Sequence, residues 1–299
     1  MDRELVAIVN GAAGGGRCRS RFDAALDRLR HHHVALDVHF TTEAGHATEI
    51  AREAYATGKR QFLSVGGDGT AFEVVNGLFP RAGDSGDVTL GILPLGTGNS
   101  FLRDFGIRDE HQALDALVAG KEKTCDVVRA KHRDGVTHYI NILSIGFGAR
   151  VGSLTNQRFK PLGPAGYVLA VFVGLARLEH ATFGIRFNGG SVDRRPCVLW
   201  SFCNSQYTGG TMWMAPHASV SDGELDVIRV GELGRIGTAA ALPKLFKGTH
   251  VRMAGIEERR ASRVEFEDMP EQNVLLDGEI VRMQLESLEV LPGALRVIA

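Results

Sequence analysis

The 299-residue sequence lacks a hydrophobic run long enough to cross a bilayer. Its most apolar segment, AGYVLAVFVGLA at Ala165–Ala176, has about twelve residues, whereas a membrane-spanning helix needs ~20. The first residues, MDRELVAIVNG, lead directly into an apolar strand and leave no room for a signal peptide. We therefore expect a cytoplasmic protein that is not embedded in a membrane.

A strong charge of either sign is also absent, because 34 Lys and Arg residues balance 35 Asp and Glu residues for a formal net charge of −1. General nucleic-acid binders are usually strongly basic, so we expect no nucleic-acid partner. The cysteines form no CxxC pair, which favours free thiols in a reducing compartment over disulfides or a zinc site. They are Cys18, Cys125, Cys197 and Cys203.

Glycine, in contrast, is abundant, with 37 residues. One glycine-rich turn, GGDG at 66–69, follows the apolar run Gln61–Val65 and precedes an amphipathic segment. Thr70 and Glu73 have the spacing of a capping box that would begin a helix there. Such a turn can surround an anion with backbone N–H groups at a helix N-terminus. Alternatively, it needs glycine only for its φ angles.

A second turn of the same kind, LGTGN at 95–99, follows another apolar strand. Strands and helices alternate through this half of the chain, which predicts a parallel sheet. The two turns should then lie at the carboxyl edge of that sheet, where ligands of such sheets bind. After about residue 125 the pattern changes to paired antiparallel strands.

The pair GGDGT…EVVNGL and LPLGTGN resembles the bacterial diacylglycerol-kinase-type lipid kinases. That family includes sphingosine and ceramide kinases, and NAD kinases and phosphofructokinases are more distant relatives. Further matching segments follow in the family's order: NILSIGFG at 141–148, the residues Asn204, Gly209, Gly210 and Asp222, and LDGE at 276–279. The departures from the family pattern are Gly11 for proline, Phe72 for asparagine and Ser100 for aspartate.

This resemblance implies an N-terminal three-layer α/β nucleotide-binding domain over residues 1–126. It implies a C-terminal β-sandwich lipid-binding domain over residues 127–299, with the final strands returning to the first domain as an open alternative. The site would occupy the cleft between the two domains. The implied reaction is transfer of the γ-phosphoryl group of ATP to a hydroxyl group of a diacylglycerol-like lipid.

Three alternatives stay open at this point. One is a sphingoid or ceramide kinase, and another is a soluble kinase of the NAD kinase or phosphofructokinase type. The third is a non-catalytic nucleotide-binding regulator. A regulator would be expected to have lost Asp68, Asp277 or Glu279, and all three are present.

For the nucleotide, the resemblance implies that backbone N–H groups of the two turns hold the phosphates. The implied contact residues are Asn10, Thr41, Gly66, Gly67, Gly69, Thr70, Gly96, Thr97 and Asn99. Thr41 could instead cap the helix that we expect over residues 45–57.

For catalysis, the spacing alone predicts that Asp277 and Gly278 form a hairpin turn between two apolar runs. The resemblance makes LDGE the catalytic turn, with Asp277 as the general base and Glu279 on the metal–nucleotide side. Asp68 is the rival carboxylate, since it could hold Mg²⁺ or orient the acceptor hydroxyl. Phosphoryl transfer needs positioning and charge neutralisation more than covalent help.

The resemblance also implies a structural Mg²⁺ on the loop around Asp222, held largely by backbone oxygens, with Ser219, Asp222 and Glu224 as the ligands. A plain Asp-Gly turn is the alternative. A lipid acceptor implies peripheral contact at the inner membrane face, for which we expect the apolar residues near 167–178. The sequence does not determine the oligomeric state, and a homodimer stays open.

Overall fold

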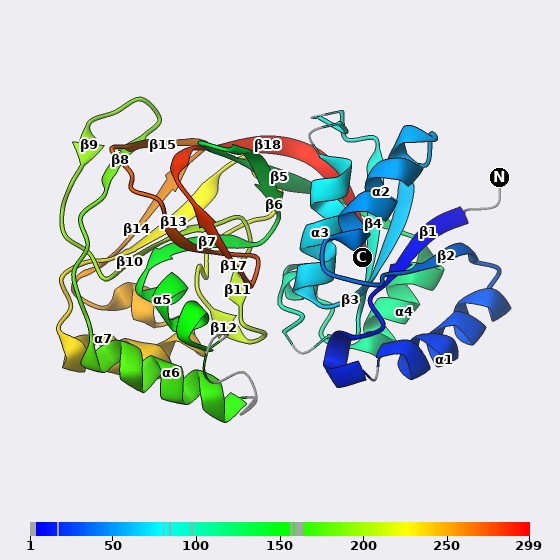
Figure 1. Ribbon diagram of the computed structural model, residues 1–299, viewed down its shortest axis with the longest axis horizontal. Coiled ribbons are helices and arrows are strands. Elements are labelled where there is room, and N and C mark those ends of the chain that lie inside the picture. Colours follow the sequence, from blue (N-terminus) through cyan, green and yellow to red (C-terminus); the bar gives the residue numbers. More distant parts are fainter. Residues whose placement is uncertain are drawn as a thin grey trace. The chain divides into compact units, whose positions relative to one another are not determined.

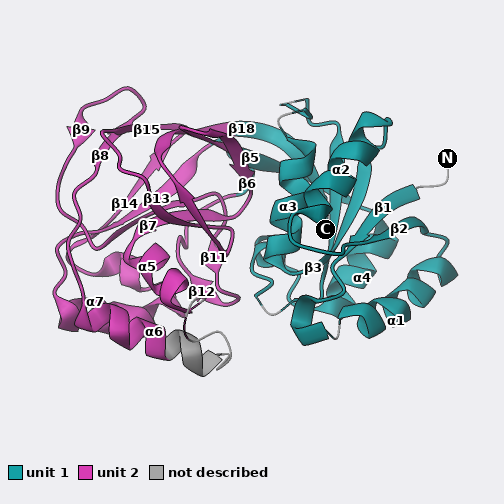
Figure 2. Cartoon of the chain, in the orientation of Figure 1, with its two compact units in different colours: residues 1–127, 220–223, 291–299 teal, residues 128–219, 224–290 magenta. Residues whose placement is uncertain are grey.

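The computed structural model describes residues 4–16, 18–79, 81–83, 85–96, 98–155, 158 and 164–299. The chain divides into two compact units (Figure 2). Unit 1 comprises residues 1–127, 220–223 and 291–299, and unit 2 comprises residues 128–219 and 224–290.

Unit 1 is built on a parallel sheet. Its strands run in the order β2 (Ala35–Phe40), β1 (Glu4–Val9), β3 (Gln61–Gly66), β4 (Val88–Pro94) and the C-terminal part of β18 (Leu285–Ile298). β4 is buried along its whole length, as is β1 after its first residue, which explains their continuous apolar sequences.

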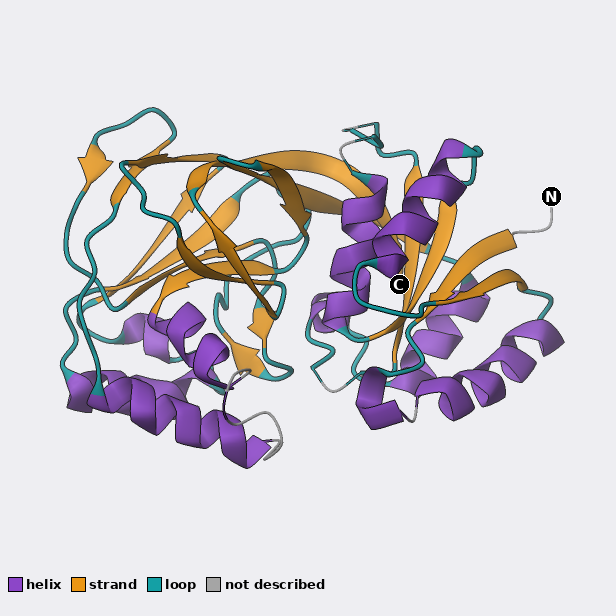
Figure 3. Cartoon of the chain, viewed as in Figure 1, coloured by secondary structure: helices purple, strands orange, loops and turns teal. Residues whose placement is uncertain are grey.

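Helices cover both faces of this sheet (Figures 1 and 3). On one face α1 (Cys18–His31) contacts α4 (Glu110–Ala119), and on the other α2 (His46–Ala56) contacts α3 (Asp68–Leu78). Two short 3-10 helices, η1 (Ala13–Gly16) and η2 (Phe101–Phe105), follow β1 and β4. The predicted three-layer α/β arrangement is therefore confirmed.

Unit 2 is a β-sandwich. One sheet is antiparallel, in the order β14 (Ile256–Ala261), β13 (Leu225–Val230), β10 (Leu199–Cys203), β7 (Ile142–Gly146), β16 (Gln272–Leu276) and β17 (Glu279–Met283). The other contains β5 (Glu122–His132), β6 (Gly135–Tyr139), β15 (Arg263–Glu267), β8 (Gly184–Phe187), β9 (Val192–Asp193) and part of β18. Aromatic rings join the sheets, because Phe187 contacts Trp200 and Phe266 contacts Phe202.

Helices α5 (Phe147–Leu154), α6 (Pro164–Ala176) and α7 (Arg235–Leu245) lie against the antiparallel sheet of unit 2. They bury a core that includes Phe147, Leu175 and Ala241 against Ile228 and Val230 of β13. The small ribbon β11 (Tyr207–Thr208) and β12 (Met212–Trp213), and η5 (His250–Arg252), complete the unit.

One buried carboxylate holds the three segments of unit 1 together. Asp126, which is 1% exposed, accepts hydrogen bonds from the backbone N–H groups of Gly223 and Gly293, each at 2.7 Å. Its own N–H donates to the carbonyl oxygen of Val220 at 2.7 Å. Burial raises the pKa of Asp126, while the two N–H donors oppose that rise.

The predicted capping box is wrong. The N-cap of α3 is Gly67, without a side-chain hydrogen bond, and Glu73 reaches α2 instead. Its carboxylate accepts from the N–H groups of Gly45 at 3.0 Å and Ala47 at 3.2 Å. The N-cap of α2 is Gly45, so the alternative role of Thr41 as a helix cap is wrong as well. Because α2 packs against α3, a side chain of α3 can accept hydrogen bonds from the unpaired N–H groups at the N-terminus of α2.

A buried histidine gives unit 2 a defined response to acid. His138 on β6 is 1% exposed, and burial together with Arg129 of β5 lowers its pKa from 6.5 to about 4. The folded protein therefore keeps His138 neutral at pH values where an unfolded chain would protonate it.

We expect unit 2 to lose stability as the pH falls from about 6.5 to about 4, because only the unfolded chain then takes up this proton. The full effect is at most on the order of 3 kcal/mol. Urea unfolding at several pH values should show a flatter dependence for His138→Gln than for the wild type. Parallel curves for the two proteins would contradict this assignment.

Candidate active site

Four loops meet at the carboxyl edge of the parallel sheet in unit 1. Since β2, β1, β3 and β4 are parallel neighbours, the residues that follow them share this edge. The backbone N–H of Thr41 donates to Val9 at 2.9 Å, that of Asn10 to Val65 at 2.9 Å, and that of Gly96 to Gly66 at 2.8 Å. The structure thus brings the two glycine turns and the predicted residues Asn10 and Thr41 together, while Thr97 lies outside the described residues.

Close approach explains the glycines of these turns better than φ freedom does. Gly66, Gly67 and Gly96 are not among the residues with positive φ. A Cβ atom on Gly96 would lie 2.4 Å from the Gly67 Cα, and one on Gly66 would lie 2.3 Å from the Thr70 hydroxyl oxygen. A Cβ atom on Gly67 would meet the Gly96 Cα at an ordinary 3.4 Å. Packing therefore requires glycine at 66 and 96 but not at 67.

Asp68, at the first position of α3, ties the first turn to the second. Its carboxylate accepts from the Ser100 N–H at 3.0 and 3.2 Å and from the Ser100 hydroxyl at 2.9 Å. Burial raises the pKa of Asp68, and the hydrogen bonds from Ser100 oppose the rise. Ser100 is one of the departures from the family pattern, and its hydroxyl supplies a donor that an ionised aspartate lacks.

Three of the predicted nucleotide residues also shape the turns. The Asn10 side chain donates to the Thr70 hydroxyl at 3.3 Å, which joins the first loop to the start of α3. Asn99 has φ 49° and donates to the carbonyl oxygens of Pro94 at 3.1 Å and Gly96 at 2.7 Å. The second turn is therefore closed by its own asparagine.

In unit 2, Asp277 is both a turn residue and a buried carboxyl group. β16 and β17 form a hairpin in which Leu276 lies opposite Glu279. The two residues between them, Asp277 and Gly278, have φ values of 48° and 92°, as a type I′ turn requires. The Asp277 carboxylate is 3% exposed and accepts from three successive N–H groups: Ile140 at 3.1 Å, Asn141 at 3.0 Å and Ile142 at 2.9 Å. The hairpin interpretation is thus correct and does not exclude a chemical role. Glu279 is exposed.

The structure adds neighbours that we did not predict as site residues. The Asn204 side chain donates to the carbonyl oxygen of Ile140 at 2.8 Å, and the Ser205 hydroxyl donates to the Asn141 side chain. All three side chains are buried. NILSIGFG and Asn204 match the family's motifs in the sequence, but only the fold shows that Asn141 and Ile142 contact Asp277 and that Asn204 contacts Ile140.

The comparisons with known proteins agree with this geometry. The family model described as "Diacylglycerol kinase catalytic domain" matches residues 4–130, and the "YegS C-terminal NAD kinase beta sandwich-like domain" matches residues 141–299. A diacylglycerol kinase from Mycobacterium tuberculosis is 30% identical over 99% of this chain and 94% of its own length. The Pseudomonas aeruginosa protein named "Probable lipid kinase YegS-like" is 33% identical, with coverage of 99% and 95%.

The chain belongs to the family of diacylglycerol kinases and YegS-like lipid kinases. The crystal structure of a candidate diacylglycerol kinase from Bacillus anthracis str. Sterne superposes with a TM-score of 0.80 at 27% identity, covering 99% of this chain and 95% of that one. An NAD kinase from Archaeoglobus fulgidus shares the fold, with a TM-score of 0.50 at 17% identity and coverage of 99% and 93%. The resemblance read from the sequence is confirmed: the protein is a lipid kinase.

The predicted metal ligands of this lipid kinase lie on one short loop. Asp222 is exposed, Ser219 and Glu224 are half-buried, and the Glu224 carboxylate pairs with Arg260 at 3.2 Å. Within the described residues, no group of three or more His, Cys, Asp or Glu side chains is arranged to hold a metal ion. The available donors are side-chain and backbone oxygens, which is the type that Mg²⁺ prefers.

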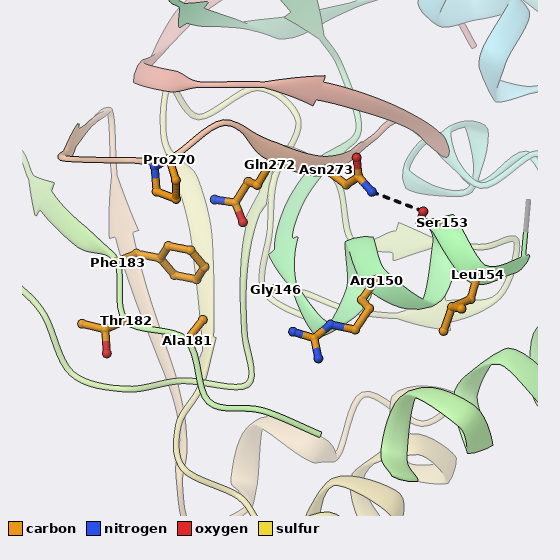
Figure 4. Close-up of a pocket in the computed structure, with 10 residues that line it drawn as sticks. All are labelled: Gly146, Arg150, Ser153, Leu154, Ala181, Thr182, Phe183, Pro270, Gln272 and Asn273. Carbon is orange, nitrogen blue, oxygen red and sulfur yellow. Dashed lines mark hydrogen bonds between the residues drawn. The ribbon is translucent and has the colours of Figure 1, made fainter. Parts of the chain in front are cut away.

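Unit 2 of the lipid kinase also contains a cavity of about 480 Å³ (Figure 4). α5 contributes Arg150 and Leu154 to its wall, Phe183 lies across from them, and Asn273 donates a hydrogen bond to Ser153 of α5 at 3.2 Å. The lining is therefore part apolar and part polar, which suits an amphipathic ligand. Among the described helices, none is both long and apolar enough to cross a membrane.

The spacing between the two turns provides a test of the nucleotide site. We expect Gly67→Ala to keep its melting temperature, because the new Cβ has room, but to weaken ATP binding by about tenfold or more, since a phosphate could no longer approach the backbone. Gly96→Ala should instead lower the stability by about 1–3 kcal/mol, because its Cβ would overlap Gly67.

Titration calorimetry with ATP and thermal unfolding distinguish these outcomes. Gly234→Ala is the matched control, because a Cβ atom at Gly234 would have no heavy atom within 4 Å. Gly234 belongs to unit 2, so this substitution should change neither the melting temperature nor the ATP affinity. Wild-type ATP affinity in a folded Gly67→Ala protein would contradict the assignment.

Proposed function

We propose that this lipid kinase transfers the γ-phosphoryl group of ATP to a hydroxyl group of a diacylglycerol-like lipid. The observation that carries the proposal is the meeting of the Gly66-Gly67 and Gly96 turns at the N-terminus of α3. A helix N-terminus next to glycine backbone is a suitable place for phosphates. The related proteins named diacylglycerol kinase and the NAD kinase solved in complex with ATP support the two substrates.

In this proposal the nucleotide is bound by unit 1. Asn10, Thr41, Gly69 and Thr70 border the phosphates together with the two glycine turns, and Asn99 belongs to the second turn. Asp68 accepts hydrogen bonds from the N–H and the hydroxyl group of Ser100 on both of its carboxylate oxygens. These bonds hold the first glycine turn in register with the second. Our scheme therefore gives Asp68 a positioning role and keeps it as the rival candidate for the base.

Asp277 is the general base in this scheme. The lipid hydroxyl oxygen forms a bond to the γ-phosphorus, the bond from that phosphorus to the β–γ bridging oxygen breaks, ADP leaves and the hydroxyl proton passes to Asp277. The Asp277 carboxylate accepts hydrogen bonds from the backbone N–H groups of Ile140, Asn141 and Ile142. The same donors fix the orientation of the group.

Mg²⁺ bound with ATP would neutralise charge on the phosphate oxygens, and we assign the exposed Glu279 carboxylate to the metal–nucleotide side of the reaction. We further propose that the loop at 219–224 holds a structural Mg²⁺, largely through its backbone oxygens. In this proposal Ser219, Asp222 and Glu224 supply the side-chain ligands, and the Glu224 carboxylate also pairs with Arg260.

Incubation of the purified protein with labelled ATP and a panel of acceptors tests the proposed function. We expect Mg²⁺-dependent phosphorylation of dispersed diacylglycerol, and loss of the product with EDTA. Exclusive phosphorylation of ceramide or sphingosine would change the acceptor but keep the reaction. Phosphorylation of NAD, with none of any dispersed lipid, would overturn the lipid assignment.

The base assignment is tested with Asp277→Asn. General-base assistance is worth about 10²–10⁴-fold, so kcat should fall by at least about 10²-fold. The amide has one acceptor oxygen for three N–H groups, so we also expect a stability loss of about 1–3 kcal/mol. Assays therefore use temperatures at which the variant is folded, and ATP binding should be unchanged.

The pH profile separates chemistry from structure. If Asp277 accepts the proton, the acidic limb of the wild-type kcat profile should disappear in Asp277→Asn. Asp68→Asn should instead weaken ATP binding and keep the acidic limb. Near-normal turnover by Asp277→Asn, with a dead Asp68→Asn that still binds ATP, would make Asp68 the base.

A further inference from the structure

The outer face of α7 exposes large apolar side chains. Ile236 is 87% exposed and Phe246, directly after the helix, is 60% exposed. Ala239, Ala240 and Pro243 between them are exposed as well. The spacing 236, 239, 240, 243 and 246 places these residues on one side of a helix. The opposite side, with Thr238 and Ala241, is buried.

The neighbouring helix α6 has a similar outer face. Leu169 is 41% exposed and Phe172 is 64% exposed, while Ala170, Val171 and Leu175 are buried. α6 and α7 contact each other, run side by side in Figure 1, and cover the same core. Their outer residues therefore face away from a common core, and we call Leu169, Phe172, Ile236 and Phe246 together the apolar ridge.

The charge around α7 is one-sided although the chain as a whole is nearly neutral. Residues 233–252 contain Arg235, Lys244, Lys247 and Arg252 and no Asp or Glu, against a net charge of −1 for all 299 residues. All four cations are exposed. Exposed apolar side chains among four cations, with Glu232 as the neighbouring carboxylate at the N-terminal end, complement a surface that is apolar within and anionic at its rim.

We propose that the apolar ridge and the cations of α7 dock the kinase onto an anionic phospholipid surface. The inference rests on the proposed function, because a lipid acceptor must be reached in its bilayer. Ile236 and Phe246 would enter the acyl–headgroup boundary, and Lys244 and Lys247 would lie at the headgroups. A second copy of the chain could also cover an apolar face. Such a dimer is disfavoured, because it would bring the four cations of one copy close to the four cations of the other.

Vesicle sedimentation without nucleotide tests the proposal. We expect the full-length wild type to bind phosphatidylcholine vesicles with 30% phosphatidylglycerol, and pure phosphatidylcholine only weakly. Ile236→Glu combined with Phe246→Glu should weaken binding by about tenfold or more, while Val136→Glu, at a 42% exposed position on β6, should stay within about twofold. Lys244→Glu combined with Lys247→Glu should remove the preference for phosphatidylglycerol and the salt sensitivity.

Several results would overturn the proposal. One is equal binding of the wild type to anionic and neutral vesicles. Another is unchanged vesicle binding by the Ile236→Glu, Phe246→Glu protein, which we call the ridge variant. A ridge variant that turns a dimer into a monomer in sedimentation velocity, with vesicle binding unchanged, would assign the face to a second copy. Since the substituted residues are exposed, thermal unfolding should confirm that every variant is folded.

Activity on detergent-dispersed diacylglycerol separates this inference from the proposed function. The ridge variant should phosphorylate lipid in micelles like the wild type and lose activity only on vesicles. If the wild type binds anionic vesicles but phosphorylates no lipid in either form, the docking surface stands and the proposed function fails. If it phosphorylates lipid in micelles without binding vesicles, the function stands and the docking surface fails.

Discussion

The backbone N–H groups of Gly223 and Gly293 both donate to the buried carboxylate of Asp126, and the architecture of unit 1 depends on this junction. The unit consists of three chain segments, and the second and third return to it only at residues 220–223 and 291–299. A buried charge without partners is costly, so the carboxylate and the two returning segments stabilise each other. The last strand, β18, then completes the parallel sheet beside β4.

The same physical device recurs at both candidate sites. Asp68 accepts from the N–H and hydroxyl of Ser100 and thereby holds two turns that are about thirty residues apart, and Asp277 accepts from three successive N–H groups more than a hundred residues upstream. In each case an aspartate at a turn fixes a remote stretch of backbone. The side chains proposed for phosphate positioning and proton transfer are thus immobilised before any substrate arrives, which is what phosphoryl transfer requires.

The two tasks that we propose, nucleotide binding and membrane docking, are assigned to different kinds of surface. The residues that we propose for nucleotide binding lie on turns that packed strands hold at one sheet edge, where a Cβ atom on Gly96 would overlap the Gly67 backbone. The apolar ridge lies on helices whose inner faces are anchored in a core of unit 2, with large side chains left in solvent. Rigid packing suits the first task, and exposed hydrophobic area suits the second.

The sequence by itself determined the local features of this protein. GGDG and LGTGN after apolar strands indicated two turns at one edge of a parallel sheet, and Asp277-Gly278 indicated a hairpin, because each depends on residues that are adjacent in the chain. Only the tertiary structure decided which remote groups these residues meet. It assigned Glu73 to the N-terminus of α2, gave Gly96 a packing role, and joined Asp126 to Gly223 and Gly293. It also left Ile236 and Phe246 in solvent, although in the sequence they are indistinguishable from core residues. The physical reason is that burial and hydrogen bonding depend on neighbours in space, and the decisive neighbours here are separated by tens to more than a hundred residues.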